Sequence, residues 1–166
     1  MLELVVGTIT QGLLWSLLAI GVFITFRVLD IADLTVEGTF PMGAGISAIL
    51  LTNGVNPFVS VLAAAIGGML AGAVTGWIHT KLKIPALLAG ILTMIALYSV
   101  NLHIMGKANI SLLRVDTVYS LLGNLFSTPT MWTVAIVGLG VAILSGLVLL
   151  WFFGTEIGAA LRATGV

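Results

Sequence analysis

Acidic and basic side chains gather in one short stretch of this chain. Four of the twelve Lys, Arg, Asp and Glu residues lie between Arg27 and Glu37, and long uncharged apolar runs flank them on both sides. Charge at membrane depth is costly, so ionisable groups in such surroundings usually face a pore, a cavity or a partner. Carboxylates placed there could meet an ammonium group, hold a cation or line the path of a polar solute.

The acidic side chains of this stretch are Asp30, Asp33 and Glu37. Their spacing of three and four residues would put them on one face if the segment were helical. With Thr35 they are candidates for a translocation path. The alternative is an ordinary loop whose acids sit in water at the membrane surface. The short apolar run that follows favours the path, because broken helices with exposed backbone are tolerated only beside cavities.

A second polar group lies near the end of a later apolar run. Tyr98, Asn101 and His103, with Ser99 between them, could line a pathway and hydrogen-bond a polar solute. The alternative is an interfacial belt, since Tyr and His commonly sit at headgroup depth. That alternative is the favoured one for this group.

The sequence predicts no catalytic residues, no metal site and no cofactor. Cysteine is absent, and His79 and His103 are too far apart in sequence to suggest a histidine metal site. No nucleophile elbow, zinc-protease helix motif or phosphate-binding loop is present. The formal net charge of zero does not suggest nucleic acid as a partner.

Composition places the chain in a lipid bilayer. It is 60% hydrophobic and 7% charged, with a mean hydropathy of +1.24. A soluble domain carries roughly 25% charged residues. The first apolar run, residues 4–26, is long enough to span a hydrocarbon core of about 30 Å as a helix.

We therefore expect an all-α fold, a polytopic transmembrane helical bundle forming a single domain over residues 1–166. About five membrane segments are expected, one of them short or discontinuous, at about 4–26, 39–52, 57–79, 84–105 and 131–153. The segment 39–52 reaches membrane length only if part of Asp33–Gly38 is counted, which suggests a discontinuous or re-entrant helix. Residues 106–130 read as a polar connection and 154–166 as an amphipathic tail.

Lysine and arginine in short loops predict the orientation. Two crossings separate the turn that holds Lys81 and Lys83 from Arg162, so these three charges share one side. Lys107 and Arg114 lie on the other side. This small excess places the Lys81 turn and the tail in the cytoplasm.

Small residues recur every four positions in the third apolar segment, at Ala64, Gly68, Gly72 and Gly76. Such stripes let helix backbones approach closely in lipid, where hydrophobic drive between helices is missing. Packing within one subunit is the favoured interpretation, and an interface between subunits is the alternative.

Two stretches resemble a known family. The sequence Phe26-Arg-Val-Leu-Asp-Ile-Ala-Asp-Leu-Thr-Val-Glu-Gly-Thr-Phe40 resembles the permease subunits of bacterial ATP-binding-cassette (ABC) importers of the branched-chain amino acid and ribose class. The stretch Leu88–Gly106 looks like the branch of tryptophan or aromatic amino acid permeases. Position 103 is usually Arg in that branch, so His103 is a departure that puts any role of a fixed charge there in doubt.

The tail Gly158-Ala-Ala-Leu-Arg-Ala-Thr-Gly165 resembles the start of the cytoplasmic coupling segment of these permeases. In the family this short helix docks on the ATPase subunit, and the resemblance implies that Glu156 and Arg162 flank or enter that contact. It also implies a second permease copy, a cytoplasmic ABC ATPase and an extracytoplasmic solute-binding protein as partners in a bacterial inner membrane.

Such permeases run on beyond this motif, so we expect the chain to be the N-terminal part of one that moves a small polar solute such as an amino acid. The resemblance implies that ATP is hydrolysed on a separate subunit. The alternatives are an ion- or proton-coupled carrier and a non-transporting membrane scaffold.

Overall fold

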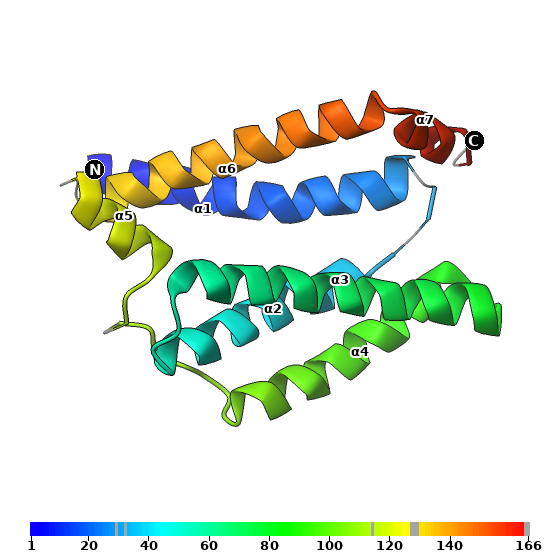
Figure 1. The fold of residues 1–166 in the computed structure, drawn as a ribbon, viewed down its shortest axis with the longest axis horizontal. Helices are drawn as coiled ribbons and strands as arrows, with labels where there is room; N and C mark the ends of the chain where they lie inside the picture. The colour runs from blue at the N-terminus through cyan, green and yellow to red at the C-terminus, as the bar shows by residue number, and fades with distance from the viewer. Residues whose placement is uncertain (29, 32, 114, 127–129, 165–166) are drawn as a thin grey trace. The chain divides into compact units, whose positions relative to one another are not determined.

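The structure is a computed structural model that describes residues 1–28, 30–31, 33–113, 115–126 and 130–164. All regular secondary structure among these residues is helical. This confirms the all-α prediction. The seven α-helices are α1 (Leu2–Phe23), α2 (Thr35–Thr52), α3 (Pro57–Leu82), α4 (Ala86–Met105), α5 (Val118–Phe126), α6 (Thr130–Phe153) and α7 (Glu156–Thr164), and a π-helical turn, η1 (Ile24–Val28), follows α1 (Figure 1).

The predicted segments 4–26, 57–79, 84–105 and 131–153 correspond to four helices that are long and apolar enough to cross a membrane, at Leu4–Val28, Pro57–Leu82, Ala86–Met105 and Trp132–Phe153. The segment expected at 39–52 is α2, which begins four residues earlier and runs without a break through Pro41. It has 18 residues, a length of about 27 Å. It is therefore short rather than discontinuous, and the chain leaves helical geometry just before it.

The region 106–130 is not only the polar connection that the sequence suggested. It contains the nine-residue helix α5, Val118–Phe126. Apolar residues recur at helical spacing there, at Val118, Leu121, Leu122 and Leu125, which is typical of an amphipathic helix. Gly123 and Asn124 interrupt this apolar pattern in the sequence.

The contacts between elements divide the chain into two compact units. The first, Met1–Ile31 with Tyr119–Val166, pairs α1 with α6 and α6 with α7. Within it α1 and α6 run in the same direction (Figure 1). The two helices are in contact near Gly138, where a Cβ would lie 3.7 Å from the Cβ of Leu13, an ordinary van der Waals distance.

The parallel run of α1 and α6 has a topological consequence. After α1 has crossed the membrane, the chain must return an odd number of times before α6 can cross in the same direction. Four helices lie between them, α2, α3, α4 and α5. With nine residues α5 is too short to cross a membrane, which leaves α2, α3 and α4. Counting α2 as a crossing meets this requirement, but α2 is not among the four helices long and apolar enough to span a membrane. The number of about five membrane segments stays a prediction.

The second unit, Ala32–Val118, packs α2 against both α3 and α4, and α3 against α4. Met42, Ala71 and Leu97 form its buried apolar core. A polar contact joins α2 to α3, where Ser47 Oγ lies 3.2 Å from Ser60 Oγ. Since Ser60 already donates to the carbonyl of Pro57 at 2.7 Å, Ser47 is the donor between the two hydroxyls.

The loop that precedes α2 lies directly against α4 at Gly90. A Cβ at position 90 would come within 2.8 Å of Asp33 Oδ1 and 2.9 Å of the backbone nitrogen of Leu34. Only glycine leaves that space free. The close approach fixes where α2 starts along α4.

The predicted small-residue stripe on α3 takes little part in these contacts. Ala64 lies 3.8 Å from a Cβ built on Gly43, but a Cβ on Gly68, Gly72 or Gly76 would meet no described atom within 4 Å. The close approach of α3 to α2 instead uses Gly67, whose Cβ would lie 2.6 Å from Ile46 Cδ1. The packing role of the stripe stays a prediction.

Gly90→Ala is expected to destabilise the protein by about 1–3 kcal/mol, because the methyl group must displace backbone rather than a flexible side chain. The measurement is unfolding of the purified full-length permease in mixed micelles. Gly140→Ala on α6 is the matched control, since a Cβ there meets nothing within 4 Å. Equal stability of the two variants would contradict the close approach.

Candidate functional site

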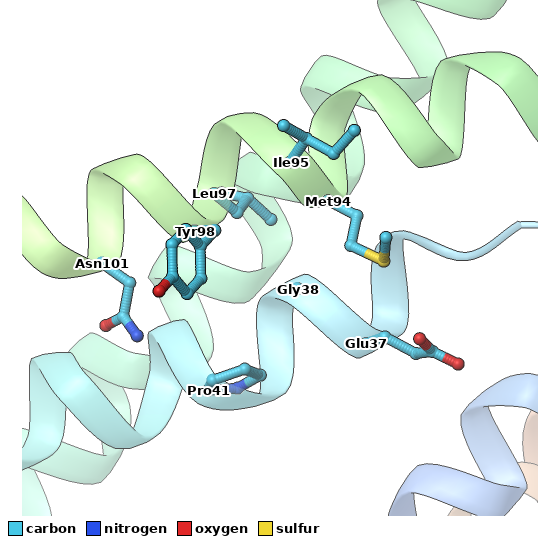
Figure 2. Close-up of a pocket in the computed structure, with 8 residues that line it drawn as sticks. All are labelled: Glu37, Gly38, Pro41, Met94, Ile95, Leu97, Tyr98 and Asn101. Carbon is cyan, nitrogen blue, oxygen red and sulfur yellow. The ribbon is translucent and has the colours of Figure 1, made fainter.

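A pocket of about 490 Å³ lies between α2 and α4 in the second unit (Figure 2). Three of its lining residues come from α2 and five from α4, namely Glu37, Gly38, Pro41, Met94, Ile95, Leu97, Tyr98 and Asn101. It joins members of both groups that the sequence singled out. Glu37 comes from the charged stretch, and Tyr98 and Asn101 come from the polar group of the fourth apolar segment.

The helical repeat explains why these residues meet. On α4 the positions 94, 97, 98 and 101 follow the spacing i, i+3, i+4, i+7, which places them on one face. On α2 Glu37 and Pro41 are four residues apart. Gly38 lets the two helices come close between them, since a Cβ there would lie 3.0 Å from the Cα of Met94.

Asn101 is held against α2 by its carbonyl end. Its Oδ1 is buried and has no hydrogen-bond partner among the described residues. A Cβ on Gly45 would collide with this oxygen. In glycine a hydrogen atom takes the place of the Cβ, so the Gly45 Cα–H group can make a weak contact with Asn101 Oδ1. The amide nitrogen is then the end that faces the pocket, and Figure 2 shows it turned toward Pro41.

Glu37 supplies acceptors at the other end of the pocket. Its side chain is exposed. Pro41 lies four residues later inside α2 and has no N–H to donate to the carbonyl of Glu37. That carbonyl therefore lacks its usual helical partner beside the carboxylate of the same residue.

Asp33 and Thr35 build the start of α2 and do not line the pocket. Asp33 Oδ1 accepts from the backbone N–H of Thr35 at 2.8 Å and from its hydroxyl at 2.5 Å. The Thr35 hydroxyl also lies 2.8 Å from Thr75 Oγ1 of α3. Because Thr35 gives its proton to the carboxylate, Thr75 is the donor between the two hydroxyls, and the carbonyl of Ala71 at 3.3 Å competes for the same Thr75 proton. This hydroxyl chain ties the start of α2 to α3, and the acid near the helix N-terminus also suits the helix dipole.

Asp30 is not brought to the pocket. It belongs to the first unit, it is exposed, and it takes a left-handed conformation (φ 52°) after η1. Neither Asp30 nor Asp33 is helical, so the condition for one shared acidic face is not met.

His103 is also outside the pocket. It is exposed on α4 and lies two residues beyond Asn101, which at 100° per residue puts it on a different side of the helix. The structure therefore separates His103 from Tyr98 and Asn101, which the sequence grouped with it.

The coupling candidates Glu156 and Arg162 lie on α7, at a tight corner with α6. Arg162 Nη2 donates to the carbonyl of Phe153 at 2.8 Å and so caps the end of α6. Gly158 packs against the same end, where a Cβ would lie 2.5 Å from the Cα of Phe153. Glu156 occupies the first turn of α7. The orientation of α7 is thus tied to α6.

Several residues of the site were not predicted from the sequence. Gly38, Pro41, Met94 and Leu97 line the pocket, and Gly45 and Gly90 set the approach of α2 to α4. The detectable signal was Pro41 inside an apolar run, four residues after Glu37. The glycine contacts depend on which helices become neighbours, which the sequence alone does not give.

Comparison with known proteins decides the family. Residues 4–166 match the family described as the branched-chain amino acid transport system / permease component. The chain belongs to this permease family. The permease is also 47% identical over 116 residues to a tyrosine transport system permease protein of Clostridioides difficile, a match that covers 70% of the chain and 39% of the relative.

A second relative is an uncharacterised protein of Rickettsia prowazekii, 36% identical over 121 residues, which are 73% of the chain and 42% of that protein. The permease chain thus spans about two fifths of the length of the curated relatives it matches. No solved structure matches it significantly. Family membership and the four apolar helices identify a multi-pass inner membrane protein and favour the permease over the carrier and scaffold alternatives.

Gly45→Ala is expected to destabilise the permease, and Asn101→Ala in the same chain is expected to relieve most of that loss. The added methyl group would collide with Asn101 Oδ1, and removing the amide supplies the space. A double-mutant cycle of unfolding free energies checks this, with an expected coupling of about 0.5–3 kcal/mol. Additive effects of the two substitutions would show that the contact is absent.

Proposed function

We propose that this permease chain is part of an ATP-driven importer that moves a small amino acid across the bacterial inner membrane. The observation that carries the proposal is the pocket between α2 and α4, in which a carboxylate, a phenol and an amide surround an apolar surface in a member of a transport permease family. Pockets of this size and lining suit small organic molecules.

The name and identity of the Clostridioides difficile relative support an aromatic amino acid as the solute. Tyrosine carries an apolar ring, a hydroxyl and an ammonium group. The pocket offers apolar surface from Met94 and Leu97 beside polar groups that can meet the other two. Glu37, Tyr98 and Asn101 are therefore our path residues, with Asp33 and Thr35 holding α2 in place.

The partners of the importer are proposed on the same basis. A cytoplasmic ABC ATPase would hydrolyse ATP, a second permease copy would complete the membrane part, and an extracytoplasmic solute-binding protein would deliver the solute. Helix α7 would dock on the ATPase. Its tight corner with α6, made by Gly158 and Arg162, supports this, because a docking helix must pass movement on without slipping.

The orientation follows from the crossings. With α2 counted as one of them, Arg27, the Lys81 turn and α7 lie on the same side, and the excess of Lys and Arg there favours the cytoplasm. The start of α2, with Asp33 and Glu37, belongs to that side. The carboxylate of the pocket would then be nearest to the exit of an inward-moving solute.

Uptake of labelled tyrosine by vesicles that hold the full-length permease, its ATPase and its binding protein is expected to require ATP. Without ATP the rate should fall to that of vesicles lacking the ATPase, and a protonophore should leave it unchanged. Uptake that continues without ATP but stops when an ion gradient is dissipated would favour the coupled carrier instead.

Gly158→Ala is expected to lower ATP-driven uptake by about tenfold, because α7 must move off the end of α6 and the coupling energy between the subunits is lost. Basal ATP hydrolysis should remain, since the ATPase itself is unchanged. Rates of uptake and hydrolysis measured on one preparation check this, with Gly140→Ala as control. Unaltered uptake per ATP would show that the corner has no role in coupling.

A further inference from the structure

The polar groups of the pocket are separated by type. Glu37, which carries acceptors, and the donors Asn101 and Tyr98 lie at opposite ends of the lining, with apolar side chains between them (Figure 2). The Glu37 carboxylate stands at the rim, directed away from the other lining side chains. Binding of a lipid acyl chain would not require acceptors and donors at opposite ends of the pocket. The arrangement has the polarity of a site for a molecule with a positive end and an accepting end.

The acceptor end has two oxygen sources on one residue. The Glu37 carboxylate carries negative charge, and the Glu37 carbonyl lacks its helical donor because Pro41 follows four residues later. An ammonium group has three donors and no acceptor. It can therefore donate to the Glu37 carboxylate and pair with its charge, whereas a ligand carboxylate has no donor and carries the same charge.

The donor end is fixed by the burial of Asn101 Oδ1. In the structure that oxygen is buried against α2 at Gly45, and the amide nitrogen is turned toward Pro41 (Figure 2). The NH₂ group is thereby left to the pocket, beside the hydroxyl of Tyr98. A hydroxyl or carboxylate of a ligand can accept from both.

We propose that the pocket selects small primary ammonium compounds that carry an apolar body and an accepting group at the far end. The ammonium group binds at Glu37, the body lies on Met94 and Leu97, and the far group accepts from Asn101 and Tyr98. This deepens the proposed function, on which it rests, by making Glu37 the group that distinguishes an amine from a molecule without one.

The absence of cysteine from the chain permits a direct measurement of occupancy. Ile95→Cys places a single thiol in the pocket lining, in the full-length permease made cysteine-free elsewhere and assembled with its ATPase. Its labelling by a methanethiosulfonate reagent is followed with and without ATP. Val100→Cys, on the same helix but not in the lining, is the matched control.

Tyramine, which has the amine and the phenol, is expected to slow labelling of Cys at position 95 and not at position 100. Phloretate, which has a carboxylate in place of the amine, should protect only at concentrations at least about tenfold higher. Glu37→Gln should remove this difference, and Glu37→Asp should largely keep it. Asn101→Leu should weaken protection by tyramine, whereas Asn109→Leu in the exposed connection should not.

Equal protection by tyramine and phloretate, or a difference that survives Glu37→Gln, would overturn the proposal. So would a thiol at position 95 that does not react in either nucleotide state, because the pocket would then be closed to solutes by protein or lipid. These readouts do not depend on transport. An importer that takes up tyrosine but shows no amine selectivity in the pocket would therefore refute this inference and leave the proposed function standing.

Discussion

The close approach of backbone to backbone at Gly90 is the constraint on which the second unit depends. In lipid, helices gain little from burying apolar surface, so small residues and hydrogen bonds must hold them together. The space left by Gly90 admits the loop of Asp33, and Asp33 then holds the first residue of α2 through two hydrogen bonds. Through Thr35 and Thr75 the same group reaches α3. Three helices are thus positioned around one glycine.

The pocket follows from that placement. Once α2 starts opposite Gly90, Gly38 lies against Met94 about one turn later and Gly45 against Asn101 about three turns later. These two contacts hold the helices at a fixed separation on either side of Pro41. The pocket walls are therefore set by backbone approach rather than by flexible side chains, which suits a site that must present polar groups in a constant arrangement.

Much of the fold could be predicted from the sequence, because long apolar runs in a bilayer have little choice but to be helices. The segments near 4–26, 57–79, 84–105 and 131–153 all form helices within a few residues of the expected bounds. The start of α2 was missed because Glu37 interrupts the apolar pattern there, and α5 was missed because it has only nine residues and Gly123 and Asn124 interrupt its apolar pattern. In the site, Glu37, Tyr98 and Asn101 were among the expected residues. Their meeting depended on the register between α2 and α4, which is decided by glycine contacts far apart in the sequence.

The corner between α6 and α7 has a mechanical consequence. Gly158 packs against the end of α6, and Arg162 donates to the carbonyl of Phe153. These contacts make the corner between α6 and α7 rigid. Because α6 packs along α1, a movement of α7 is passed to both α6 and α1. Along the chain, α1 is joined to α2 through a short segment in which Asp30 and Asp33 are not helical. The stiffness of this short segment would then determine how much of a movement of α7 reaches α2, the helix that carries Glu37.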